Sequence, residues 1–344
     1  MEKKKKHTIR ALITTIIAVP VMYYLALNPF EKRADFHLSD FYMSSAARRA
    51  EVRLSKDIVI VPVDYYSRTD IINTVKEVSH NNPSAIMLDI FMDSRQEGDE
   101  ELIEILNSCP NLILPTSLSG MSEQSLYGNI ASSYTGYAEL YTGLEGTSVR
   151  RFMAVSPDGA VSMAGRAAKL KRDIELPKDD PLINFAGVQF EEIFRDELHD
   201  YPELVQDKIV IVANVKDFGD VHKTSLGYLS GAYIQAYITQ TLLDGSAPKE
   251  VPKVVIIIVA FVLCFVWMWI HSLFNDEVGG GYSNMVFRIA QIVVILLIYY
   301  AGSWLFIEEE RYADLSLILL LVSAAALIFD FVDGISDIRQ YREK

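Results

Sequence analysis

Four long apolar stretches, one at the start of the chain and three near its end, constrain the fold most strongly. Each comes close to the ~20 residues that an α-helix needs to cross the ~30 Å of hydrocarbon in a bilayer. A buried helix of a soluble protein could imitate one of them, but three in close succession favour membrane helices. The sequence therefore predicts four transmembrane helices, at residues 11–28, 254–273, 286–307 and 314–333.

The first apolar stretch follows a basic segment at residues 1–10, which contains Lys3, Lys4, Lys5, Lys6 and Arg10. A secretory signal peptide begins in the same way. No small-x-small cleavage site follows here, because the next residues read Asn-Pro-Phe-Glu. We therefore expect an uncleaved membrane anchor, with a cleaved signal peptide as the alternative.

Basic residues beside membrane helices mark the cytoplasmic side of the membrane. The basic segment at residues 1–10 places the N-terminus in the cytoplasm and sends residues 29–250 across the membrane. With four helices, the basic tail at residues 334–344 returns to the cytoplasm. These cytoplasmic segments are too small to hold a kinase, a cyclase or another output domain.

The formal net charge of −13 lies in the exported segment. Between Phe30 and Glu250 there are 34 acidic and 21 basic residues, and their difference accounts for the whole charge. Nucleic acid is excluded as a partner, since phosphates need a basic surface. The two cysteines, Cys109 and Cys264, lie in different parts of the chain, so no disulfide framework is expected.

Short apolar runs alternate with helical patterns along the exported segment. The runs are continuously apolar and rich in β-branched residues, as in strands of a parallel sheet covered on both faces. Helices between them imply right-handed crossover connections. We therefore predict an α/β extracytoplasmic domain with a mostly parallel sheet. The predicted strands are Asp57–Asp64, Ser84–Phe91, Asn111–Pro115 and Lys208–Val215, and the predicted helices are Ser67–His80, Gly98–Ser108 and Ala232–Leu243.

Two segments depart from this alternation. Gly120–Arg151 is rich in Ser, Gly and Tyr, and we interpret it as loops and short strands, with an aromatic ligand-facing insert as the alternative. Arg150–Met163 has the pattern of a hairpin that turns at Asp158 and Gly159.

Acidic residues follow several predicted strands, at the end where open α/β sheets bind ligands. Their carboxylates could gather at one edge of the sheet and hold a divalent cation or a cationic ligand. The alternative is that each aspartate caps a helix or folds its own turn. The sequence identifies no particular metal. The candidate ligand-binding residues are Asp64, Asp89, Asp93, Asp217, Asp220 and His222.

No catalytic arrangement stands out in the sequence. It contains no serine in a nucleophile elbow, no Cys/His signature and no HExxH motif. We therefore expect a protein without enzymatic activity, and we can name no cofactor. A transporter subunit is also disfavoured, because Asp330 and Asp333 lie near the end of the fourth helix and outline no path through the membrane.

Several segments resemble the second type of CHASE domain, the cyclase- and histidine-kinase-associated sensory extracellular domain. The resemblance runs from about Asp35 to Gly245, and its most specific part is DVHKT at Asp220–Thr224, followed by Gly231 and Ala232. It implies an exported sensory domain between one N-terminal and three C-terminal membrane helices. The tryptophan-proline-arginine stretch usual after the first strand is absent here. The matching segments are DIVIVPVD at 57–64, SAIMLDIFMD at 84–93, INFAG at 183–187, KIVIVANVKDFGDVHKTSLG at 208–227 and GAYIQAYITQTLLDG at 231–245.

With no output domain in view, the resemblance implies a sensory or ligand-binding protein of a bacterial inner membrane that relays to a separate signalling partner through its helices. The alternative is a structural or assembly subunit of a cell-envelope complex, whose exported domain docks other proteins. The sequence leaves the ligand, the partner and the oligomeric state open, including a homo-oligomer.

Overall fold

The computed structural model describes residues 2–27, 38–92, 94–119, 125–130, 134–140, 148–278 and 280–324. The chain divides into two compact units. One unit, which we call the ectodomain after its predicted location, is Ala47–Pro248; the other, which we call the membrane unit, combines Met1–Ala46 with Lys249–Lys344. Each is described by itself.

The ectodomain contains a six-stranded sheet in which all neighbouring strands are parallel. The strand order is β4-β3-β2-β6-β1-β5. The predicted α/β class with a mostly parallel sheet is therefore confirmed. The strands are β1 Arg53–Pro62, β2 Ala85–Asp89, β3 Leu112–Thr116, β4 Tyr134–Tyr137, β5 Val188–Glu192 and β6 Ile209–Ala213.

The three central strands are the apolar runs that the sequence shows most clearly. Ile58 to Val61 of β1, Ile86 to Leu88 of β2 and Ile209 to Val212 of β6 have no exposed surface. Side chains of successive strand residues point to opposite faces. Continuous burial therefore requires a layer of helices on both sides of the sheet.

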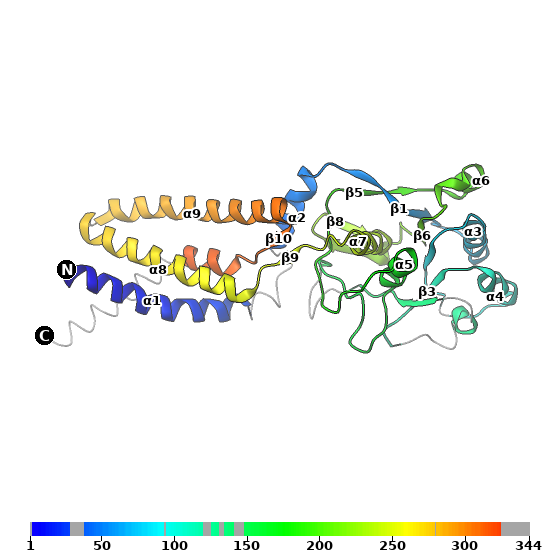
Figure 1. Ribbon diagram of the computed structural model, residues 1–344, viewed down its shortest axis with the longest axis horizontal. Coiled ribbons are helices and arrows are strands. Elements are labelled where there is room, and N and C mark those ends of the chain that lie inside the picture. Colours follow the sequence, from blue (N-terminus) through cyan, green and yellow to red (C-terminus); the bar gives the residue numbers. More distant parts are fainter. Residues whose placement is uncertain are drawn as a thin grey trace. The chain divides into compact units, whose positions relative to one another are not determined.

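Two groups of helices provide these layers, as Figure 1 shows. Helices α3, α4 and α6 contribute to a core with Val59, Leu88 and Val210 on one face. Helices α5 and α7 pack against each other and against strands of the sheet. These helices are α3 Arg68–His80, α4 Asp99–Ser108, α5 Met163–Lys171, α6 Arg195–Asp200 and α7 Gly231–Asp244.

Local signals fix several helix ends. Ser67 caps α3 and accepts a hydrogen bond from the Asp70 amide at 3.2 Å, as the sequence pattern predicts. The predicted acidic helix begins at Asp99, one residue late, because Gly98 has a φ of +91° and lies outside the helical region. The Asp158-Gly159 turn is present, with an antiparallel bridge between Val155 and Val161.

Among its described residues, the membrane unit has three helices long and apolar enough to cross a membrane. They are α1 Glu2–Leu27, α8 Lys253–Val278 and α9 Gly280–Glu309, and their apolar windows are His7–Tyr24, Lys253–Phe274 and Met285–Glu309. Residues 316–324 of the predicted fourth span are helical. Residues 314 and 315 precede this helix, while residues 325–333 of the span, with Asp330 and Asp333, and the predicted tail lie outside the described residues.

One short helix and two pairs of short strands also belong to the described residues. Helix α2, Leu38–Arg49, follows α1 in the chain. Two short strands, β9 Lys249–Glu250 and β10 Arg311–Tyr312, pair in parallel within the membrane unit. A hairpin of β7 Val221–Thr224 and β8 Gly227–Ser230 leads into α7.

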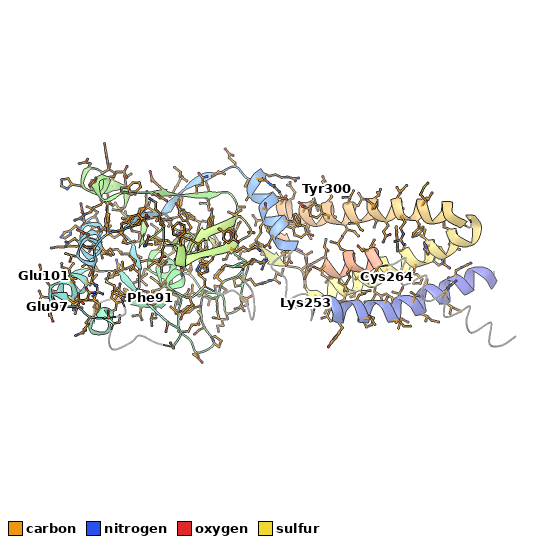
Figure 2. The ribbon with its side chains drawn as sticks, turned by 180° about the vertical axis from the view of Figure 1, so that it is seen from behind. Phe91, Glu97, Glu101, Lys253, Cys264 and Tyr300 are labelled. Atoms are coloured by element: carbon orange, nitrogen blue, oxygen red, sulfur yellow. The ribbon has the colours of Figure 1, made fainter. Side chains whose placement is uncertain are left out.

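Side chains in the membrane unit separate by polarity, as a lipid environment requires. His7 Nδ1 lies 2.7 Å from Ser272 Oγ, and both side chains are buried. Gln291 Nε2 donates to the carbonyl oxygens of Val322 and Ser323 at 2.6 and 2.8 Å. Figure 2 labels Cys264, which is buried, and Tyr300, which is exposed on α9. Apolar side chains cover the outer surface of these helices.

Candidate functional site

The central strands β1, β6 and β2 end at the same level. Ala213, the last residue of β6, is paired with both Pro62 of β1 and Asp89 of β2. We call this end of the sheet the carboxyl edge. Loops that leave it start side by side, which explains why residues from three distant parts of the sequence meet there.

Asp64 fixes the loop after β6 to the loop after β1. Its Oδ1 accepts a hydrogen bond from the Lys216 amide at 2.9 Å, and Lys216 Nζ lies 3.9 Å from its Oδ2. The Asp64 side chain is 7% exposed. Its carboxylate is therefore occupied in holding two loops together.

Asp217 folds its own turn. Its Oδ1 accepts from the Gly219 amide at 2.8 Å and caps the short 3-10 helix η3, Phe218–Asp220. This is the local role that aspartate commonly has in turns.

Asp220 and His222 form a pair beside the start of α7. His222 Nε2 lies 3.0 Å from Asp220 Oδ1, and both side chains are partly exposed. A Cβ atom at Gly231 would lie 2.3 Å from Asp220 Oδ2, so glycine is needed for the carboxylate to sit there. Because Gly231 begins α7, the positive end of the helix dipole stabilises the Asp220 charge.

Asp89 interacts electrostatically with this pair. Burial, together with the nearby Asp220 charge, raises the pKa of Asp89 to about 7, while His222 acts in the opposite direction. A negative charge near a buried carboxylate disfavours the ionised form of that carboxylate. The arrangement can therefore take up a proton, or another positive charge, near neutral pH.

The structure thus brings together three of the six candidate residues: Asp89, Asp220 and His222. Asp64 and Asp217 hold loops at the same edge, and Asp93 lies outside the described residues. Within the described ranges, no group of three or more His, Cys, Asp or Glu side chains could hold a metal ion.

The sequence interpretation missed residues that act through backbone contacts or through shape. Lys216 meets Asp64 mainly with its amide, which has no side-chain signature. Gly231 supports Asp220 by lacking a side chain. The signal for Gly231 was present, because it follows the DVHKT segment in the resemblance to the sensory family.

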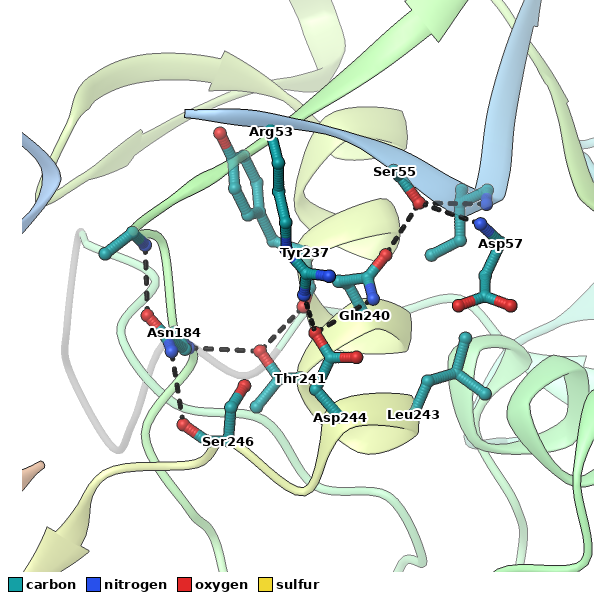
Figure 3. Close-up of polar contacts among 12 residues, drawn as sticks. Arg53, Ser55, Asp57, Asn184, Tyr237, Gln240, Thr241, Leu243, Asp244 and Ser246 are labelled. Carbon is teal, nitrogen blue, oxygen red and sulfur yellow. Dashed lines mark hydrogen bonds and ion pairs between the residues drawn. The ribbon is translucent and has the colours of Figure 1, made fainter. Parts of the chain in front are cut away.

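The far end of α7 is held by a network of side chains, drawn in Figure 3. Ser55 Oγ donates to Gln240 Oε1 at 2.7 Å, and Gln240 Nε2 donates to Asp244 Oδ2 at 2.9 Å. Arg53 Nη2 donates to the same Asp244 oxygen at 2.8 Å. The network connects the last turn of α7 to the beginning of β1.

Asn184 holds the same end from the other side (Figure 3). Its backbone amide donates to Thr241 Oγ1 at 3.1 Å, and its side-chain Nδ2 donates to the Ser246 carbonyl oxygen at 3.3 Å. Its own Oδ1 accepts from the Ala186 amide at 3.0 Å. The INFAG segment thus fixes the chain where it leaves α7 for β9 and α8.

Gln240→Ala is expected to lower the free energy of unfolding of the ectodomain by about 1–3 kcal/mol, because it leaves the buried Ser55 hydroxyl without its acceptor. Pulse proteolysis of the intact, detergent-solubilised chain in urea measures the change. Gln189→Ala, at an exposed position on β5, is the matched control. Equal unfolding midpoints for the two variants would contradict the prediction.

An α/β domain whose polar groups gather at the carboxyl edge, continuous in sequence with membrane helices on both sides, defines the class of membrane-anchored extracellular-type domains. The family model of the CHASE2 domain matches residues 14–275, from within α1 to within α8. The chain belongs to the CHASE2 domain family, a family of sensory extracellular domains, and the predicted resemblance is confirmed. Comparisons with curated proteins and with solved structures find no match.

Proposed function

We propose that this protein is a sensor that binds its signal with the ectodomain and relays it through the membrane helices to a separate partner chain. The observation that carries the proposal is the path of α7. Its first residue, Gly231, lies against Asp220, and its last, Asp244, is tied to β1. From there the chain passes through residues 245–252 into α8.

The orientation supports this role. Lys3 to Lys6 and Arg10 precede the apolar window of α1, which favours a cytoplasmic N-terminus and an exported ectodomain. We place the protein in a bacterial inner membrane with the ectodomain in the periplasm. Helices α8 and α9 leave residue 279 alone between them, so no output domain fits there.

Labelling with a membrane-impermeant thiol reagent tests the orientation. Glu104→Cys, on the exposed face of α4, is expected to react in intact spheroplasts, and Lys5→Cys only after lysis. The native thiols Cys109 and Cys264 are buried and give little background. The opposite pattern of labelling would overturn the orientation.

Co-purification tests the relay. The intact, tagged chain is crosslinked in its native membrane and isolated in mild detergent. We expect a kinase, a cyclase or another regulator to accompany it in a fixed ratio. Recovery of the chain alone, or only with copies of itself, would contradict the proposal that the relay requires a separate partner.

We also propose that the role is not enzymatic. An Asp–His pair such as Asp220 and His222 also occurs in nucleophilic triads, but among the described residues the neighbouring buried Ser230 hydroxyl has no hydrogen-bond partner. His222 therefore has no activated serine at that position.

A structural or assembly subunit remains the second candidate, and the exposed aromatic side chains of the ectodomain favour it. A constitutive complex that does not depend on any signal would support this second candidate.

A further inference from the structure

Four aromatic side chains stand out from the carboxyl edge of the sheet. Phe218 is 93% exposed, Tyr65 88%, Tyr228 75% and Phe91 49%. They follow strands β6, β1 and β2, or lie on the hairpin that comes after β6. We call these four residues the aromatic rim. Single exposed apolar residues are common, but several aromatic rings at one edge mark an interaction surface.

Contacts between the loops bring the rim residues to one place. The Lys216 amide bonded to Asp64 places the loop of Phe218 beside that of Tyr65. Asp220 interacts with Asp89, which is two residues before Phe91. Tyr228 pairs with Lys223 in the hairpin that starts next to Asp220. The rim residues therefore lie on the same loops as the candidate site.

Tyr65 is held outward by a tight turn. The Tyr66 amide donates to the Val63 carbonyl oxygen at 3.1 Å, and Tyr65 has a φ of +64°. This left-handed conformation is unfavourable for a residue other than glycine. Glycine or asparagine would adopt this conformation with less strain. A role for the exposed ring in binding would explain why the position holds tyrosine.

Charges of both signs lie on the loops that carry the rings, and they include Lys216 beside Asp64 and Lys223 opposite Tyr228. Asp217 and Asp220 lie next to Phe218 in the chain, while Asp64 is paired with Lys216. Glu97 and Glu101 are exposed as well, but they lie together near α4 and apart from Phe91 (Figure 2). Aromatic faces beside carboxylates attract Lys and Arg side chains through cation–π and ionic interactions.

We propose that the aromatic rim docks a basic segment of a partner protein, which inserts Lys or Arg side chains between the rings. This inference rests on the proposed function, in that it names the class of signal that the ectodomain receives. A second copy of the chain fits poorly, because the exported segment carries the whole net charge of −13 and like surfaces repel. Anionic lipid headgroups are repelled for the same reason.

Site-specific photocrosslinking in the full chain tests the proposal. Benzoylphenylalanine placed at Phe218 or Tyr228 is expected to form a discrete adduct with one other protein in native membranes. The control position is Tyr134, which is 42% exposed and begins β4 at the opposite edge of the sheet. Mass spectrometry should place the crosslink in a peptide containing Lys or Arg.

Charge variants show whether the carboxylates take part. Asp217→Asn should lower the adduct from position 218 severalfold, and asparagine keeps the turn at 217 because its oxygen still accepts a hydrogen bond from the Gly219 amide. Asp173→Asn removes one exposed charge after α5 and should change the adduct less than twofold. Equal losses in the two variants would mean unspecific attraction and would overturn the proposal.

Other outcomes also decide the matter. An adduct with a second copy, with a glycan or with lipid, or no adduct at all, overturns the proposal of a basic partner. Failure of the relay is read separately, since it appears as loss of the co-purified membrane partner while the adduct at position 218 persists.

Discussion

Asp89→Asn is expected to stabilise the ectodomain above pH 7 by as much as about 4 kcal/mol. The pKa of Asp89 rises from 3.8 to about 7 on folding, mainly through burial and through Asp220, and each unit corresponds to about 1.4 kcal/mol. The folded state thus holds this proton more tightly than the unfolded chain does. Stability therefore falls as the pH rises from about 4 to about 7, and the asparagine variant should lose this slope.

Urea unfolding of the intact chain in detergent, followed by pulse proteolysis at several pH values, measures the effect. Asp173→Asn, an exposed carboxylate, is the control and should keep the slope of the parent. Asp220→Asn should remove part of the slope, because it removes the like charge that contributes to the shift. A slope unchanged in Asp89→Asn would show that Asp89 is not the group that titrates.

Gly136→Ala should destabilise the ectodomain by about 3 kcal/mol or more, as overpacking against rigid structure does. A Cβ atom there would lie 2.7 Å from both N and Cα of Met163, the first residue of α5. These are backbone atoms, so relief requires β4 and α5 to separate. The midpoint of thermal unfolding, followed by the protease resistance of the intact chain, measures the loss of stability.

Gly219→Ala is the matched control for this substitution. The nearest atom to its added methyl group is the Asp217 carboxylate oxygen at 3.2 Å, on a side chain that can move. The expected change is below about 1 kcal/mol, as for most surface substitutions. If both alanine variants melted like the parent, the close approach of β4 to α5 would be wrong.

The sequence predicts the central strands well and the outer strands poorly, for a physical reason. Strands β1, β2 and β6 are buried on both faces and therefore consist of apolar, β-branched residues. Strand β5, with Glu191 and Glu192, lies at the edge of the sheet and mixes polar with apolar residues. Strand β4 has four residues, two of them tyrosines. Neither leaves a pattern that differs from that of a loop.

The position of β6 could not be predicted either. It is the last long buried run in the sequence, yet it lies between β1 and β2. Local patterns carry no information on which strands become neighbours over more than one hundred residues. The sequence thus locates the central strands along the chain, but only the structure shows their order in the sheet.

The candidate site was predictable to the extent that it follows from the parallel sheet. Asp89 and the Asp220–His222 pair meet because strand ends converge. Whether an aspartate faces its neighbours or its own loop depends on backbone amides, as with Asp217 and Gly219. The sequence of α7 predicts a helix but not the hydrogen bonds of its polar side chains, because their partners Ser55 and Asn184 lie far away in the sequence.

The short pairing of β9 with β10 has a mechanical consequence. The Lys249 amide donates to the Glu310 carbonyl at 2.9 Å, and the Val251 amide to that of Tyr312 at 2.8 Å. These two hydrogen bonds hold the start of α8 beside the end of α9. The joined ends form a fulcrum, the point about which α8 would tilt. Since α8 has 26 residues and is about 39 Å long, a tilt of about 5° at the fulcrum would swing its other end, near Ser272 and His7, by about 3 Å.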